Sequence, residues 1–359
     1  MSALLPLRHK PFRYLVAGRF ITMLGNALAP IALAFAVLDL TGSVNDLGLV
    51  VGARSLMNVM FLLFGGVIAD RLPRHLVMVA SSVLAALTQA AVATLILTGS
   101  ASIGLLAALA AVNGAASAFA FPAGAAIMAQ TVPQELLQSA NSLNRLGINT
   151  AMIVGASAGG VLVATVGPGW GLAFDAATFL LAALAFAGIR VPRVSSRAPV
   201  ARSAFSAFTD LRDGWREFTA HTWLWVVVLG FAVLNMIRAA SLSVLGPAIA
   251  DETFGRQGWG LVLAVQTGGM VAGTLVALAI RSRRLLRFGI MCILGELPIM
   301  FALAKVPFLL VLLPLAMLAG VATVQFSIAW ETTMQRYIPA DKLARVYSYD
   351  MLGSIMVIP

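Results

Sequence analysis

Long apolar stretches follow one another along the whole chain, and short polar segments separate them. Stretches of about 18 to 25 such residues are long enough for a helix to cross a hydrocarbon core roughly 30 Å thick. They are apolar on every side, whereas the strands of a membrane barrel alternate between an apolar and a polar face. We therefore predict an all-α fold that crosses a membrane many times. The predicted helices cover residues 13–38, 47–69, 76–98, 102–129, 143–166, 170–189, 223–249, 259–281, 288–305 and 308–331, and an eleventh opens near Arg345.

The composition agrees with a membrane protein. Of 359 residues, 60% are hydrophobic and 11% are charged, and the mean hydropathy is +0.95. A soluble domain carries about 25% charged residues. The one cysteine, Cys292, has no partner for an intrachain disulfide. No cleavable signal peptide precedes the first predicted span, so we expect this span to direct insertion.

The charges are distributed unevenly over the connections. The net charge is +10, from 24 Lys and Arg and 14 Asp and Glu. Eighteen of the basic residues lie in the N-terminal segment and in every second connection, and the other connections hold two, Arg256 and Lys305. Basic residues concentrate in cytoplasmic loops, which predicts a multi-pass protein of the cell membrane with a cytoplasmic N-terminus. We predict no nucleic-acid partner, because no soluble basic domain is present to hold a duplex.

The longest connection, residues 191–222, is basic and divides the chain. In its second half, aromatic and aliphatic residues recur at the spacing of an amphipathic helix, which we expect to lie on the cytoplasmic leaflet. These residues are Phe205, Phe208, Leu211, Trp215 and Phe218. The predicted organisation is an N-terminal transmembrane half (1–190), a linker (191–222) and a C-terminal half (223–359).

The two halves contain a repeat. Residues 128–147 and 334–353 align at a constant offset of 206 positions, and both segments join the fourth to the fifth span of their half. The alignment pairs Pro133 with Pro339 and Ser142 with Ser348, among others. We therefore predict two six-helix units related by a parallel repeat. Because the chain reaches Pro359 within its eleventh span, we expect about 11 of 12 spans and an incomplete second unit.

Residues 65–75, GGVIADRLPRH, carry the most specific motif. They are similar to the G-x-x-x-D-R-x-G-R-R signature between helices 2 and 3 of the major facilitator superfamily, with Pro73 and His75 in place of a glycine and an arginine. The resemblance extends over essentially the whole chain. Segments such as FAFPAGAAIMAQTVPQELLQSANSL and AFDAATF look like the branch that contains siderophore and macrolide exporters and transmembrane secretion effectors.

The motif suggests a gate. Gly66 permits close approach of another backbone, whereas Asp70 ends a helix, where the macrodipole disfavours an anion. Compensation is expected from Arg71 and Arg74, and the resemblance implies a further partner at the start of helix 11, near Arg345. Such a contact would close the cytoplasmic side and break when that side opens. The alternative is a charge cluster that only fixes topology.

Polar residues at bilayer depth are functional candidates. The resemblance implies that spans 1, 4, 7 and 10 line a central cavity, with 2, 5, 8 and 11 beside them. The candidates for contact with substrate are Asn26, Asn58, Asn235, Arg238 and Gln266, and the candidates for ion coupling are Asp39, Glu296 and Glu331.

Each charged candidate has a structural alternative. Arg238 would attract an anionic substrate group, or pair with Asp39 or another acid. Glu296 would titrate, or bind backbone groups that Pro298 frees. Glu331 lies near the cytoplasmic end of its span, where we expect an ion pair with Arg336 or Arg145.

No motif indicates an enzyme. A GxxxxGK[ST] nucleotide loop is absent from the sequence, and the three histidines, His9, His75 and His221, form no ligand spacing. We predict no cofactor and no metal. The first hypothesis is a monomeric secondary transporter that exports a small amphipathic or hydrophobic compound by alternating access, with proton antiport. The alternatives are an exporter of an anionic metabolite or siderophore that uses Arg238, and a non-transporting or truncated membrane protein.

Overall fold

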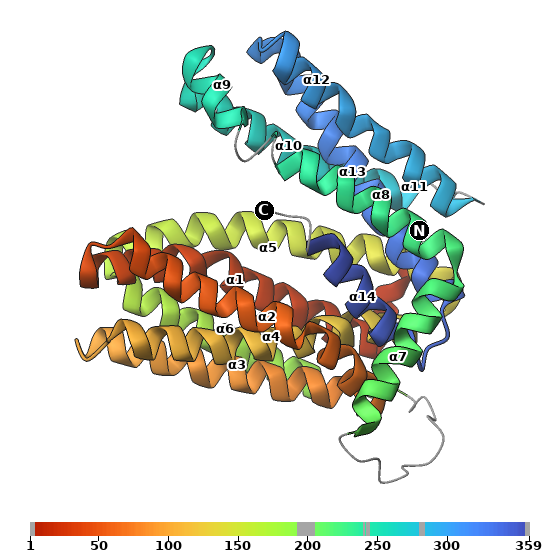
Figure 1. Cartoon of the computed structure of the whole chain (residues 1–359), viewed down its shortest axis with the longest axis horizontal. Helices are drawn as coiled ribbons and strands as arrows, with labels where there is room; N and C mark the ends of the chain where they lie inside the picture. The colour runs from red at the N-terminus through yellow and green to blue at the C-terminus, as the bar shows by residue number, and fades with distance from the viewer. Residues whose placement is uncertain (1–3, 192–204, 240, 242–244, 280–283, 356–359) are drawn as a thin grey trace.

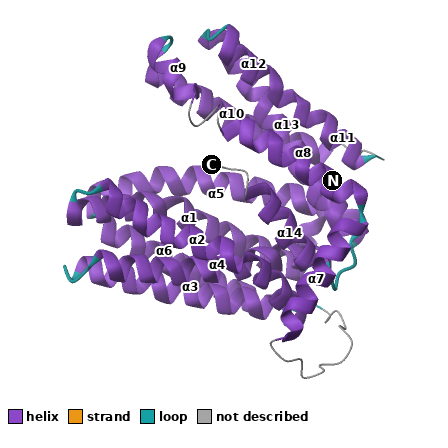
Figure 2. Cartoon of the chain, viewed as in Figure 1, coloured by secondary structure: helices purple, strands orange, loops and turns teal. Residues whose placement is uncertain are grey.

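The regular elements of the protein are helices, as Figures 1 and 2 show. This computed structural model describes residues 4–191, 205–239, 241, 245–279 and 284–355. The helices of the first half are η1 (Leu5–Arg8), α1 (Lys10–Thr41), α2 (Val44–Arg71), α3 (Arg74–Leu97), α4 (Ile103–Thr131), η2 (Gln134–Leu136), α5 (Leu137–Val166) and α6 (Pro168–Ala187). They are followed by α7 (Phe205–Ala220), α8 (Thr222–Ala239), α9 (Gly246–Glu252), α10 (Gly255–Ala279), α11 (Leu285–Ile293), η4 (Leu294–Glu296), α12 (Leu297–Lys305), α13 (Leu309–Tyr337) and α14 (Leu343–Ile355). The predicted all-α fold is confirmed.

The helices have the length and surface that a bilayer requires. Within the described ranges, nine spans are long and apolar enough to cross a membrane, and a tenth is obtained if α7 and α8, which meet at 93°, count as one. Large apolar side chains point outward, and Leu310 is 85% exposed. Such apolar faces suit contact with lipid, because their exposure to water would be unfavourable in free energy.

Helices α1 to α6 pack into one group through close contacts at small residues. Helix α2 packs on α4, α3 on α6, and α1 on both α5 and α6. A Cβ atom at Gly155 would overlap the carbonyl oxygen of Leu24, and one at Gly159 would crowd Leu28. These α5 glycines let α1 approach closely.

Helices α8 to α14 form a second group, in which α13 packs on α10 and α11 and α14 packs on α8. The groups meet where α14 contacts α2 and α4, and where the first turns of α5 contact α10 and α13. In Figure 1 they converge near α7 and α14 and diverge toward α9 and α12. We call the converging end the basic end, because Arg74 at the start of α3, Arg336 in the last turn of α13 and Lys342 directly before α14 lie there.

Two predicted spans contain more than one helical element, although Leu285–Lys305 still forms one candidate membrane span. Of the predicted span 223–249, the structure describes α8 up to Ala239 and α9 from Gly246, and residues 240 and 242–244 between them lie outside the described residues. Pro247 occupies the first turn of α9, where its missing N–H costs no helical hydrogen bond. The predicted span 288–305 contains the 3₁₀ turn η4, directly before Pro298 in the first turn of α12.

The second half of the linker is helical as predicted, since α7 covers Phe205–Ala220. Predictions that fall on residues 192–204 and 280–283, including Arg193, Arg197, Arg202, Arg281 and Arg283, lie outside the described residues, as does Pro359.

Candidate functional site

Asp70 lies at the C-terminal end of α2, against the start of α14. Its Oδ1 accepts a hydrogen bond from Arg74 Nη2 at 2.9 Å, and its Oδ2 accepts one from Arg345 Nε at 2.9 Å and one from the Arg345 backbone N–H at 3.3 Å. The Asp70 side chain is only 4% exposed. A carboxylate this buried requires paired charges, and these bonds supply them from both groups of helices.

Arg74 connects three segments at the basic end. Besides Asp70, its guanidinium donates from Nη1 to the carbonyl oxygen of Ala126 in α4 at 3.2 Å. It also donates from Nη2 to the carbonyl oxygen of Ala340, just before α14. The side chain is 6% exposed. A planar, five-donor group suits such a junction better than lysine would.

Gly66 lies one turn before Asp70, where α2 touches α14. A Cβ atom here would overlap Ser348 Oγ and the backbone of Ala344 and Arg345. We call Gly66, Asp70, Arg74 and Arg345 the gate cluster. Arg71, the remaining predicted gating residue, is exposed.

Helix α7 covers the outer side of α14. Lys342 Nζ donates to Glu217 Oε2 at 2.7 Å, and Tyr349 Oη donates to the carbonyl oxygen of Leu211 at 2.8 Å. Partial burial acts to raise the pKa of Glu217, but Lys342 and His221 together act more strongly, so its pKa lies below the usual value. The linker helix thus adds a second set of contacts at the basic end.

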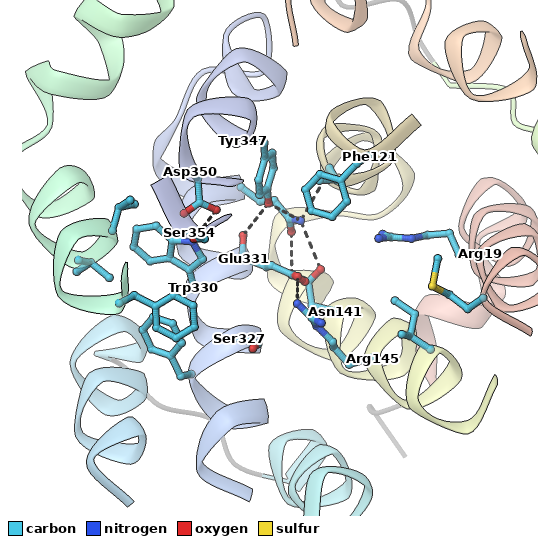
Figure 3. Close-up of a pocket in the computed structure, with 18 residues that line it drawn as sticks. Arg19, Phe121, Asn141, Arg145, Ser327, Trp330, Glu331, Tyr347, Asp350 and Ser354 are labelled. Carbon is cyan, nitrogen blue, oxygen red and sulfur yellow. Dashed lines mark hydrogen bonds and ion pairs between the residues drawn. The ribbon is translucent and has the colours of Figure 1, made fainter. Parts of the chain in front are cut away.

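A cavity of about 290 Å³ lies between the two groups of helices. Figure 3 shows side chains that converge on it from both groups. Its charged lining consists of Arg19, Arg145, Glu331 and Asp350. Its aromatic lining consists of Phe121, Phe231, Phe326, Trp330 and Tyr347.

Polar contacts between α5, α13 and α14 form one side of this cavity. Arg145 forms an ion pair with Glu331 through Nη2 and Oε1, which confirms one of the two pairings predicted for Glu331. Asn141 Nδ2 donates to Gln335 Oε1 at 2.8 Å, and Gln335 Nε2 donates to Tyr347 Oη at 3.2 Å. Parts of the cavity wall therefore belong to the contact between the two groups.

Asp350 is a cavity residue that the sequence analysis did not single out. Its Oδ2 accepts a hydrogen bond from Trp330 Nε1 at 3.2 Å. The available signal was an acid inside the apolar eleventh stretch, at the position that the repeat pairs with Asn144.

The other predicted candidates lie away from this cavity. Asn58 donates from Nδ2 to the carbonyl oxygen of Gly114 at 3.1 Å and so links α2 to α4. Asn235 and Gln266 are buried, and Asn26 and Arg238 are partly buried. Among the described lining residues of the cavity, only Glu331 comes from the predicted candidates.

Two candidates for ion coupling, Glu296 and Asp39, lie in surroundings other than the cavity. Glu296 is 2% exposed and accepts a hydrogen bond from Thr323 Oγ1. The structural alternative for Glu296 had predicted backbone groups near Pro298 as partners, and the partner that the structure shows is a side chain. Arg238 is within electrostatic range of Glu296. Asp39 is exposed at the end of α1 and is not paired with Arg238 in the described part of the chain.

Comparisons with known proteins identify the family that has this architecture. The sequence model of the Major Facilitator Superfamily matches residues 15–356. The multidrug efflux pump Tap of Mycolicibacterium fortuitum is 26% identical over 348 residues, which cover 92% of this chain and 82% of the pump.

Solved structures show the same fold at lower identity. A bacterial homologue of the iron transporter ferroportin, in an outward-facing state, superposes with a TM-score of 0.74 at 18% identity, covering 97% of this chain and 89% of the homologue. The human organic anion transporter MFSD10 gives a TM-score of 0.74 at 15% identity, covering 97% of this chain and 91% of the transporter.

Proposed function

Because this chain belongs to the major facilitator superfamily of membrane transporters, we propose that it exports a small amphipathic or hydrophobic compound from the cytoplasm by alternating access, in exchange for protons. In this proposal the protein lies in the cell membrane with its N-terminus and the basic end in the cytoplasm. The 26% identical relative is a multidrug efflux pump, which supports the direction of transport.

The gate cluster is the observation that carries the proposal. Asp70 from α2 is bonded to both Arg74 and Arg345, and Arg345 belongs to the other group of helices. Rocking the groups apart at the basic end breaks the Asp70–Arg345 pair and uncovers Gly66. We therefore assign this state to one closed toward the cytoplasm, with the opposite end as the exit.

The cavity supports the class of compound. Its walls combine aromatic and aliphatic side chains with a few charged groups, as sites for drug-like molecules commonly do. Glu331, paired with Arg145 across the two groups, is our candidate for the proton-binding group. Protonation would remove its charge and weaken a contact that holds the groups together.

Reconstitution tests this function. Proteoliposomes containing the protein and an imposed proton gradient are loaded with a panel of fluorescent dyes, and efflux is measured with and without an uncoupler. Uncoupler-sensitive efflux that Asp70→Asn lowers would support a gated exporter. No efflux of any dye from correctly inserted protein would instead favour a non-transporting protein.

Efflux confined to anionic dyes and lost in Arg238→Ala would favour the anion exporter. Arg238→Lys is the matched control, because it retains the charge. We rank this function second because Arg238 is outside the described cavity lining and Glu296 balances part of its charge.

A further inference from the structure

The four charged residues of the cavity are divided by sign between the two groups of helices. The first group contributes Arg19 from α1 and Arg145 from α5, and the second contributes Glu331 from α13 and Asp350 from α14. One ion pair, Arg145 with Glu331, joins the two sides. The cavity therefore has a cationic wall and an anionic wall, and each wall has a charge that the other does not neutralise directly.

The cationic wall retains unused donors. Arg145 Nε is buried and has no hydrogen-bond partner among the described residues, although Nη2 of the same side chain binds Glu331. Arg19 makes no hydrogen bond or ion pair within the described ranges, and Figure 3 shows its guanidinium directed into the cavity. Buried N–H groups without acceptors are costly. Two such guanidinium groups suit a carboxylate or a similar anionic group.

The anionic wall retains an unused acceptor beside aromatic faces. Asp350 accepts a hydrogen bond from Trp330 through Oδ2, and Oδ1 accepts none from the described residues. Trp330 stacks on Phe326 with ring centroids 6.2 Å apart, and Phe326 stacks on Phe231 at 4.8 Å. A carboxylate next to a stack of aromatic rings suits an ammonium group with an apolar body, through charge and cation–π attraction.

A ligand with one charge would serve only one wall. A simple cation next to Asp350 would leave Arg19 without a partner, and a simple anion next to Arg19 would leave Asp350 without one. A neutral compound would bury both charges without neutralising either, which is unfavourable. A compound with an anionic and a cationic group satisfies both walls while the Arg145–Glu331 pair remains between them.

We propose that the exported compound is an amphipathic zwitterion. Its anionic group binds Arg19 and the free Nε of Arg145, its cationic group binds Asp350, and its apolar body packs on Phe231, Phe326 and Trp330. The inference rests on the proposed function, which leaves the charge of the compound open, and specifies the substrate class of the same cavity.

Three compounds of the quinolone type test the inference: norfloxacin and its ethyl ester share one ring system and differ in charge, and nalidixic acid is a smaller analogue without the basic piperazine ring. Near neutral pH norfloxacin is a zwitterion, norfloxacin ethyl ester is a cation and nalidixic acid is an anion. Their binding to the purified full-length protein in nanodiscs is measured by quinolone fluorescence. We expect norfloxacin to bind with a Kd about tenfold lower than either singly charged compound. Equal affinities, or tightest binding of a singly charged compound, would overturn the proposal.

Variants assign the two ends of the ligand. Arg19→Gln should weaken norfloxacin binding about tenfold and leave the ester unchanged, and Arg19→Lys should restore most of the affinity. Asp350→Asn should weaken binding of norfloxacin and the ester and leave nalidixic acid unchanged. If Arg19→Gln weakens the ester as much as norfloxacin, the assignment of Arg19 is wrong. The ligand series on the unmodified protein decides the proposal even if a variant fails to fold.

Efflux of the uncharged dye Nile red separates this inference from the proposed function. Uncoupler-sensitive Nile red efflux without selective norfloxacin binding would overturn the inference alone. Selective norfloxacin binding without efflux of any compound would retain the site and overturn the exporter.

Discussion

The gate cluster and the cavity both lie between the two groups of helices. They differ in how many of their charged side chains have ion-pair or hydrogen-bond partners. At the gate, both Asp70 oxygens accept hydrogen bonds from arginines, and Arg74 has three acceptors. In the cavity, Arg19 and one oxygen of Asp350 are without partners among the described residues. A complete network holds one conformation, whereas an incomplete one leaves interactions for a ligand. Under our proposals, the comparison separates the residues that would close the basic end from the residues that would bind the exported compound.

The largest effect is expected from a steric obstruction of the gate cluster. Gly66→Leu should lower efflux at least tenfold, because the side chain would overlap Ser348 and the α14 backbone and overpacking costs about 1–3 kcal/mol or more. Efflux rates per inserted protein in proteoliposomes check this. Gly48→Leu on the same helix is the control, since nothing lies within 4 Å of a Cβ there. Equal rates for both variants would show that α2 and α14 need not touch.

Removing the gate charge should have the next largest effect. Asp70→Asn leaves Arg74 and Arg345 without their carboxylate, and breaking a buried pair costs about 3–5 kcal/mol. We expect lower efflux and an opened basic end. A cysteine in place of the fully buried Val346, in a Cys292→Ser background, should then react faster with an impermeant maleimide in inside-out vesicles.

Asp39→Asn is the matched control, because Asp39 is exposed. Unchanged labelling of Val346→Cys in the Asp70→Asn background would show that Asp70 does not hold the basic end closed.

Exchanging one partly buried acid of the cavity, Glu331, tests the cavity side of the comparison. Glu331→Gln removes the charge that pairs with Arg145, and we expect efflux to fall about three- to tenfold, in line with a coupling of about 1 kcal/mol, and to lose its dependence on the proton gradient. Glu296→Gln is the control, since Glu296 binds Thr323 away from the cavity. If Glu296→Gln removes the proton dependence of efflux and Glu331→Gln does not, the proton-binding group is Glu296 and not Glu331.

The smallest effect is expected where α7 covers the gate. Tyr349→Phe removes the hydrogen bond to the Leu211 carbonyl oxygen, and such a bond contributes about 1 kcal/mol. The Tm should fall by about 2–4 °C while efflux stays within twofold. A larger loss of efflux at an unchanged Tm would make α7 a part of the gate.

Much of the fold followed from the sequence because apolar length is sufficient to identify a membrane helix. The contacts of Asp70 with Arg74 and with the start of α14 also followed, since Asp70 and Arg74 lie in a compact motif and the resemblance implied a partner at the start of helix 11. That these contacts form a gate stays a prediction. That the Arg345 side chain itself pairs with Asp70 could not be derived from the motif, because this contact depends on how α14 is rotated against α2.

The cavity was harder to predict for the same reason. Asn26 and Asn58 lie near the centres of their helices, but α1 and α2 are apolar on nearly every side, so the sequence contains no signal of which face turns inward. Asn58 consequently proves to link α2 to α4. Asp350 lies in the repeated segment, but a repeat predicts topology and does not indicate which of its positions face a cavity.

The division of charge in the cavity has a consequence for how membrane voltage acts on the protein. With both acids ionised, Arg19, Arg145, Glu331 and Asp350 sum to zero, and a bound zwitterion adds nothing to that sum. An electric field does work of about 2.3 kcal/mol per 100 mV on each elementary charge that crosses it. It does none on a neutral assembly that moves as a whole. Under the proposed proton exchange, a proton that neutralised one of the two acids would leave the cavity with one net positive charge, and the membrane potential would then act on any movement in which that charge changes sides.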